Sequence, residues 1–404
     1  MQTFRYKATD VSGMTRTGVL NAESENEIIN MLREKALRPV SIQQVEQTST
    51  DLDQFALFKK KVKLVDIAVF CRQLSAMLKA GMALDRAIST QILQTENKTL
   101  KESLTKVSSQ VKQGNPLSKC FSEQPTIYPK LLVNMVEAGE ITGDMDGALT
   151  RMATHFEKEN KINRRIKGAM MYPIVLLLLT VVVAIALLVF VIPQFSGLFQ
   201  AAGGGLPGLT QFVVNISDFI KGYWYILIIV LIAIVVGIKY WLKTTNGRFT
   251  FDSWKLKLPI VKKPMQQIVT ARFTRTLSTM LSSGISLVHS MESAAETSNN
   301  VLVVKKIGEA LEDLKQGAPL TMQLRKTELF PEMMLSMIGI GEETGEMDSM
   351  LSKTADYYDE EFDSAIGKLL SLLEPLLIIF MAGVIGFIVI AMYMPIFDLA
   401  TTVM

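Results

Sequence analysis

Residues with the potential for chemistry are concentrated in one eight-residue stretch, which the chain carries twice. The first copy is Gly139-Glu140-Ile141-Thr142-Gly143-Asp144-Met145-Asp146, and the second is Gly341-Glu342-Glu343-Thr344-Gly345-Glu346-Met347-Asp348. Carboxylates, a hydroxyl and two glycines recur at the same offsets. The candidate site is therefore the set of positions that the copies share: Gly139, Glu140, Thr142, Gly143, Asp146, Gly341, Glu342, Thr344, Gly345 and Asp348.

The spacing within this motif predicts a corner between two helices. Its two glycines suit a tight reversal that needs positive φ. Thr142 is expected to cap the following helix, and Asp144 and Asp146 would lie in the first turn, where the helix dipole favours negative charge. A corner alone does not require Glu140 or Glu342. The same surface is therefore also a candidate docking site for a partner.

Nothing else in the sequence predicts catalysis or a cofactor. His155 and His289 are the only histidines, and each falls on a helical stretch as a surface or core residue. The glycine run at 203–205 lacks the lysine of a phosphate-binding loop, and no nucleophile–base pair stands out. Cys71 and Cys120 have no zinc spacing and read as reduced, packed thiols. We therefore expect no enzyme, no cofactor and no metal site.

The composition indicates membrane spans joined to soluble domains. The 404 residues are 49% hydrophobic, yet 20% of them are charged, which is too many for a chain wholly within lipid. The formal net charge of +3 does not single out nucleic acid as a partner, so none is predicted. The first residues lack the apolar stretch of a signal peptide, so internal spans are expected to insert the chain.

The motif belongs to a longer duplication. At a spacing of 203 residues, Phe70, Arg72, Leu74, Ser75, Met77, Leu78, Gly81 and Leu84 match Phe273, Arg275, Leu277, Ser278, Met280, Leu281, Gly284 and Leu287. The spacing becomes 202 before the motif, and Pro173 and Pro193 still match Pro375 and Pro395. The copied unit is therefore a helical domain plus the span that follows it. A further span between the copies makes the two repeats parallel.

Hydrophobic periodicity and uncharged stretches predict a mostly α integral membrane protein with two homologous cytoplasmic helical-bundle domains, three transmembrane helices and a small N-terminal α+β module. The expected boundaries are 1–47 for the module, 48–63 for a linker, 64–168 for the first cytoplasmic helical domain, 171–193 for transmembrane helix 1, 194–222 for a periplasmic loop, 223–242 for transmembrane helix 2, 265–368 for the second cytoplasmic helical domain, and 372–394 for transmembrane helix 3.

Basic residues predict the topology. Lys and Arg crowd the start of the first span and the end of the second, and Lys368 precedes the third. The opposite ends of the spans are almost free of them. Since positive charge marks the cytoplasmic side, the N-terminus is expected in the cytoplasm and the C-terminus in the periplasm.

The paired motifs, the repeated Phe-x-Arg-x-Leu-Ser-x-Met-Leu pattern and the three spans resemble the type II secretion F-protein / PilC family. Phe4, Tyr6 and Ala8 near the N-terminus and Leu206-Pro207 also fit. The resemblance implies a platform protein of the bacterial inner membrane that assembles a type IV pilus or a type II secretion pseudopilus. It implies as partners a cytoplasmic hexameric motor ATPase, pilins or pseudopilins, other inner-membrane assembly proteins, the lipid bilayer and further copies of the chain, as a dimer or higher homo-oligomer.

The resemblance also raises the question of calcium, which some secretion-type members bind through carboxylates of the first domain. The matching positions here are Glu96, Thr150 and Thr154. Two of the three lack a carboxylate, and Ca²⁺ prefers several charged oxygen ligands, so no calcium site is predicted.

Two other functions stay open from the residues alone. The chain could be a small polytopic transporter, although the first and third spans carry no ionisable residue near mid-membrane, where transport sites usually have them. It could also be a sensor subunit without a catalytic site, although its expected outside loop is short for a ligand domain.

Overall fold

The computed structural model describes residues 2–9, 15–22, 29, 31, 38–45, 61–201 and 207–402. The chain divides into two compact units, Met1–Lys61 and Val62–Met404. Each unit is described by itself.

The first unit contains a three-stranded antiparallel sheet. Its strands are β1 (Gln2–Thr9), β2 (Thr15–Ala22) and β3 (Arg38–Val45), in the order β2-β1-β3. Phe4 pairs with Leu20 on one side and with Gln44 on the other. The helix expected before residue 38 and the linker at 48–63 lie almost entirely outside the described residues, so the α+β class of this module stays a prediction.

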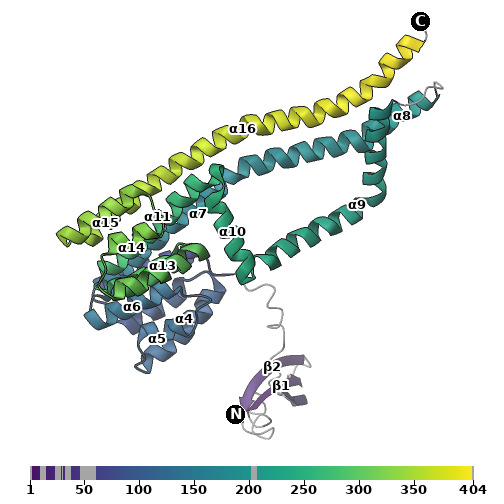
Figure 1. Cartoon of the computed structure of the whole chain (residues 1–404). Helices are drawn as coiled ribbons and strands as arrows, with labels where there is room; N and C mark the ends of the chain where they lie inside the picture. The colour runs from purple at the N-terminus through teal and green to yellow at the C-terminus, as the bar shows by residue number, and fades with distance from the viewer. Residues whose placement is uncertain are drawn as a thin grey trace. The chain divides into compact units, whose positions relative to one another are not determined.

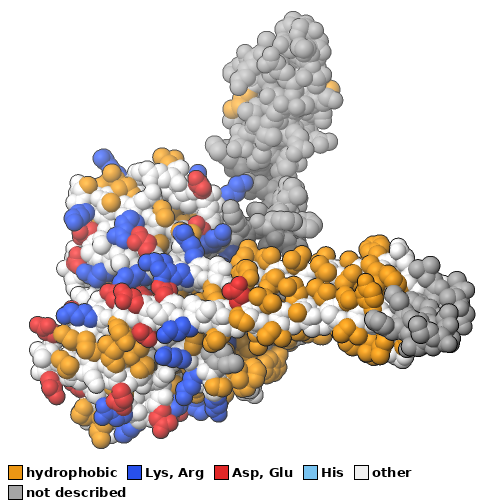
Figure 2. Space-filling model, turned by 90° about the horizontal axis from the view of Figure 1, so that it is seen from above, with side chains coloured by type: hydrophobic (Ala, Val, Ile, Leu, Met, Phe, Trp, Pro, Cys, Tyr) orange, Lys and Arg blue, Asp and Glu red, His pale blue; other side chains and the backbone are white. Residues whose placement is uncertain are grey.

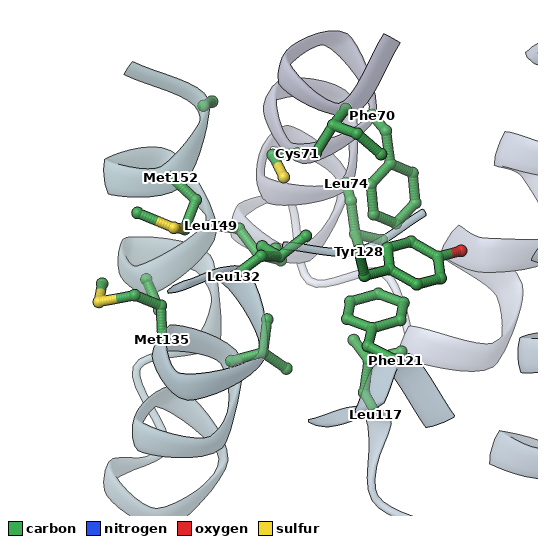
Figure 3. Close-up of a cluster of buried hydrophobic side chains, with 14 of the residues drawn as sticks. Phe70, Cys71, Leu74, Leu117, Phe121, Tyr128, Leu132, Met135, Leu149 and Met152 are labelled. Carbon is green, nitrogen blue, oxygen red and sulfur yellow. The ribbon is translucent and has the colours of Figure 1, made fainter. Parts of the chain in front are cut away.

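The first helical repeat is a bundle with an aromatic core. Its helices are α2 (Leu64–Lys79), α3 (Leu84–Gln94), α4 (Lys98–Lys112), α5 (Leu117–Ser122), α6 (Lys130–Thr142) and the start of α7 (Met145–Ala186). The Phe121 ring stacks on the Tyr128 ring, with 4.1 Å between the ring centroids (Figure 3). It packs edge-on against the Phe70 ring, with 6.0 Å between the centroids. The Tyr128 hydroxyl bonds Ser103 at 2.8 Å, so its buried polar end is satisfied.

The second repeat follows the same plan. Its helices are α11 (Pro259–Leu281), α12 (Leu287–Thr297), α13 (Val301–Lys315), α14 (Leu320–Lys326), α15 (Glu332–Thr344) and the start of α16 (Met347–Thr402). Asn97 caps α4, and Asn300 caps α13 in the same way, through side-chain oxygens that accept two backbone N–H groups. Local backbone chemistry is thus repeated along with the helices.

In the part of the chain that the structure describes, three helices are long and apolar enough to cross a membrane: Met145–Phe195, Gly208–Trp241 and Met347–Pro395. α7 continues through a π-helical turn, η3 (Leu187–Val191), into α8 (Ile192–Ala201); α9 (Gly208–Trp241) then leads to α10 (Thr245–Lys257). α7 and α16 run side by side out of the helical repeats (Figure 1). Hydrophobic side chains cover this part of the surface, while charged side chains gather on the repeats (Figure 2).

The membrane helices extend further than the sequence indicated. Pro193 does not end the first span, because α8 continues past it, and Pro395 lies inside α16. The segment 194–222, expected to be a loop, is helical up to Ala201 and again from Gly208 onward. A proline inside a helix removes one N–H donor without ending the helix, provided that another group satisfies the carbonyl it leaves free.

Thr210 of α9 satisfies that carbonyl in the third span. Pro395 has no N–H, so Ala391 O, four residues earlier, lacks its α-helical donor. The Thr210 hydroxyl donates to Ala391 O at 2.6 Å, and Thr210 is buried.

Ser217 of α9 serves the first span in a related way. In the π-helical turn, Ile192 N–H donates to Leu187 O and not to Leu188 O. The residue five positions after Leu188 is Pro193, which has no N–H to give. Leu188 O accepts instead from the buried Ser217 hydroxyl. α9 therefore joins both repeat-related spans at their prolines.

Candidate functional site

The first copy of the motif forms the corner between α6 and α7. Gly143 ends α6 in the left-handed region, with φ +77°. Gly139 lies within α6 and is needed for a different reason: a Cβ there would lie 2.9 Å from Ala148 Cβ on α7. The expectation that both glycines serve the reversal through positive φ is therefore wrong for Gly139, which permits close packing of the two helices.

Glu140 holds the N-terminus of another helix. Its carboxylate accepts hydrogen bonds from the backbone N–H groups of Leu117 and Ser118 and from the Ser118 hydroxyl. These are the first residues of α5, where N–H groups have no partner inside the helix and the dipole favours negative charge. This carboxylate, which the corner alone does not require, thus ties α6 to α5.

The second corner repeats this geometry between α15 and α16. Gly345 also has φ +77°, and a Cβ on Gly341 would lie 2.9 Å from Met347 Cα. Glu342 accepts from Leu320 N at 2.8 Å and Thr321 N at 3.2 Å, at the start of α14. The same carboxylate therefore caps the matching helix in each repeat.

The threonine of the motif does not cap the following helix. Thr142 and Thr344 donate back to Ala138 O and Ile340 O in their own helices, at 2.8 Å each. The cap of α7 is Asp144, which accepts from Gly147 N at 3.1 Å. The Asp144 carboxylate reaches the Gly147 amide, whereas the Thr142 hydroxyl is already engaged in the preceding turn.

Asp146 and Asp348 lie in the first turns of α7 and α16. Their backbone oxygens accept from the Ser75 and Ser278 hydroxyls at 2.9 and 2.8 Å. These serines belong to α2 and α11, so each corner is tied to the first helix of its own repeat. The repeated serine was visible in the duplication, but its partner is revealed only by the fold.

Charged groups join the two repeats along α7, α11 and α16. Arg272 of α11 donates to Glu159 of α7 at 2.6 Å, and both side chains are largely buried. Lys158 pairs with Asp356. Sequence reasoning missed these pairs because their partners are more than one hundred residues apart and no local pattern relates them.

His155 lies at this contact of α7 with α11 and α16, which we call the seam, and it is buried. Burial, with a smaller contribution from the nearby cations Arg275, Arg272 and Lys158, lowers its pKa to about 3. The imidazole is therefore neutral at physiological pH. Its Nδ1 has no hydrogen-bond partner among the described residues.

Two of the three positions considered for calcium, Thr150 and Thr154, make other contacts. The Thr150 hydroxyl lies 2.6 Å from that of Ser75 and donates to Asp146 O. Thr154 Oγ1 accepts from the Arg72 guanidinium at 3.0 Å. A fixed positive charge therefore stands next to Thr154.

The chain is similar to known proteins over nearly its whole length. The family described as "Type II secretion system (T2SS), protein F" matches residues 70–193 and 273–395, and its N-terminal domain matches 1–43. Type IV pilus assembly protein PilC of Myxococcus xanthus is 34% identical over 98% of this chain and 95% of its own. Type II secretion system protein F of Vibrio cholerae is 32% identical over 99% and 98%. The PilC protein of Thermus thermophilus is 34% identical over 100% and 99%.

Proposed function

Because the chain belongs to the type II secretion protein F family, which includes PilC proteins, we propose that it is an inner-membrane platform that couples a cytoplasmic hexameric motor ATPase to the movement of pilins or pseudopilins. The names of the relatives support the platform role. The ATPase and the pilins are inferred as partners, together with other inner-membrane assembly proteins and further copies of the chain. The activity that consumes ATP is assigned to another chain, and this one is not an enzyme.

The observation that carries the coupling proposal is helix continuity. α16 runs unbroken for 56 residues, which corresponds to about 84 Å at 1.5 Å per residue. It begins at the second corner and ends beyond the third span. α7 likewise starts at the first corner and enters the first span. A displacement of either corner would therefore reach the membrane without a flexible joint.

An insertion within α16 tests this coupling. Three glycines between Gly367 and Lys368 would interrupt the helix at its entry to the membrane, whereas seven alanines would keep it helical and nearly in register. We expect the glycine insertion to abolish pilus or pseudopilus assembly, with membrane insertion and ATPase co-purification retained, and the alanine insertion to be milder. Normal assembly with the glycine insertion would overturn the coupling.

The first corner is the proposed docking surface for the motor. Since Glu140 caps α5, docking would depend on other exposed groups, and Ile141 between Glu140 and Thr142 is 80% exposed. We expect Ile141→Arg to reduce co-purification of the ATPase. Glu343→Arg changes the matching position of the second repeat and is the control. Equal retention of the ATPase by both variants would remove the first corner as the docking surface.

The domain arrangement and orientation form part of the proposal. We place both helical repeats in the cytoplasm and the C-terminus in the periplasm, in line with the basic residues that flank the spans. A reporter fused at Met404 is expected to be active only in the periplasm. Cytoplasmic activity of this reporter would reverse the orientation without affecting the family assignment.

A further inference from the structure

A pocket of about 480 Å³ lies where α11 begins and α16 enters its membrane span. The lining positions of α16 recur every three or four residues, so they form one continuous helix face. Along this face the chemistry changes from polar to apolar. The polar end carries Glu361, Ser364 and Lys368, and the apolar end carries Leu369, Leu372, Leu373 and Leu376.

The polar end of the pocket favours an anion. Lys263 of α11 and Lys368 of α16 both line it, and neither has a carboxylate partner in the part of the chain that the structure describes. α11 begins at Pro259, also a lining residue, so its positive dipole end adds to the field. The one acidic lining residue, Glu361, accepts from Gln267 at 3.1 Å and lies two helical turns, about 10 Å, before Lys368.

Among the described residues of the first repeat, the matching face of α7 is covered. Ile162 matches Ser364 and is only 5% exposed, packed against Ile268 and Phe362. Glu159 matches Glu361 and is paired with Arg272 of the second repeat. The duplication therefore leaves one such face uncovered, on α16, where the lining includes two lysines.

We propose that this pocket binds one anionic phospholipid. Lys263 and Lys368 would hold the phosphate, and an acyl chain would lie along Leu372, Leu373 and Leu376. The order of polar and apolar groups follows the bilayer normal, because Lys368 precedes the expected span at 372–394. The one charged residue within that span, Glu374, does not line the pocket and accepts from the Tyr172 hydroxyl at 3.3 Å. A partner helix or a second copy would not require two unpaired ammonium groups at this depth. The proposal depends on the proposed orientation of the chain in the membrane for one point only, the assignment of the lipid to the cytoplasmic leaflet.

The test measures lipid retention by the purified full-length chain in detergent, using native mass spectrometry with phosphatidylglycerol and phosphatidylcholine of identical acyl chains. We expect one phosphatidylglycerol to be retained in preference to phosphatidylcholine. The double variant Lys263→Gln/Lys368→Gln should weaken this binding about 20-fold. Lys167→Gln/Lys262→Gln alters two exposed lysines outside the pocket and should leave the binding unchanged.

Two further measurements distinguish binding of a whole phospholipid from binding of phosphate alone. Leu373→Trp keeps both lysines but fills the apolar end, and it should also weaken phosphatidylglycerol. Inorganic phosphate should compete poorly, because it lacks the acyl chain. Three outcomes would overturn the proposal. Phosphate could compete as effectively as lipid, or both lysine pairs could lose phosphatidylglycerol binding equally. Alternatively, Lys263→Gln/Lys368→Gln could lose oligomer mass in place of lipid. All of these readouts are independent of ATPase binding and pilus assembly.

Discussion

The two helical repeats share one fold but place the same ion pair in different surroundings. In the first repeat Arg72 binds Glu157 at 2.7 Å, with side-chain exposures of 43% and 48%. The matching pair in the second repeat, Arg275 and Asp359, has exposures of 7% and 24%. The difference arises because α11 and α16 face α7 across the seam. Duplication thus preserves the helix caps and corners of the fold, while the burial of each surface depends on the elements packed next to it.

The largest effect is expected from removing one partner of the buried pair. Arg275→Met leaves Asp359 without its cation, and we expect a loss of about 3 kcal/mol in the free energy of unfolding. Arg72→Met, at the matching exposed position, should cost less than about 1 kcal/mol. Chemical denaturation of the full-length chain in nonionic detergent measures both.

A double variant sharpens this comparison. Arg275 Nε and Asp359 Oδ1 are buried without hydrogen-bond partners among the described residues, so the pair retains part of its desolvation cost. Arg275→Met/Asp359→Leu should therefore recover most of the stability that Arg275→Met loses. Equal losses in Arg72→Met and Arg275→Met would show that the seam does not bury the second pair.

A second difference concerns His155, whose match in the second repeat is Tyr357. The folded chain keeps His155 neutral, since its pKa is lowered to about 3, whereas the unfolded chain takes up a proton below pH 6.5. Stability is therefore lost as the pH falls through this window. At pH 5 the loss from this group should be about 2 kcal/mol relative to pH 7.

The contribution of His155 to the pH dependence of stability is measured by comparing variants with the parent chain. His155→Leu should unfold with a shallower dependence on pH between 7 and 5, and Tyr357→Phe should leave that dependence as in the parent chain. Parallel pH profiles for the parent and His155→Leu would show that the imidazole is protonated in the folded state or exchanges with solvent.

The sequence predicted the repeated elements much better than the contacts between them. Gly143 and Gly345 mark the corners because a positive φ leaves a local signature, and helical periodicity does the same for the bundles. The role of Glu140 was missed because its partners, Leu117 and Ser118, meet it only after α5 and α6 have packed. The local effect of a proline is to break a helix, so sequence alone favours spans that end at Pro193 and Pro395, whereas the compensating hydroxyls lie on another helix, α9.

The carboxylate caps of the two corners should differ in strength. Glu140→Ala removes an acceptor from two backbone N–H groups and from the Ser118 hydroxyl, and should cost about 1.5 kcal/mol. Glu342 is exposed, so water can replace it at the start of α14, and Glu342→Ala should cost about 0.5 kcal/mol. Denaturation profiles of the two variants test this order. A larger loss at Glu342 would show that solvent access does not decide the strength of the cap.

Similarly small effects are expected from removing the hydroxyls that α9 offers to the two membrane prolines. Ser217→Ala leaves Leu188 O without a donor, and Thr210→Val does the same to Ala391 O. Each should cost about 0.6 kcal/mol, the usual size of hydrogen bonds between membrane helices.

Thr180→Val is the matched control in the first span. Thr180 is also buried, but its hydroxyl donates to Leu176 O of its own helix, four residues earlier. That carbonyl already has a backbone donor, because residue 180 is not a proline, so the loss should be close to zero. Unfolding by sodium dodecyl sulfate in mixed micelles compares the three variants. If Thr180→Val were as costly as Ser217→Ala, the prolines would not explain why α9 carries these hydroxyls. A greater loss for Ser217→Ala than for Thr210→Val would instead assign the weaker backbone to the π-helical turn of the first span.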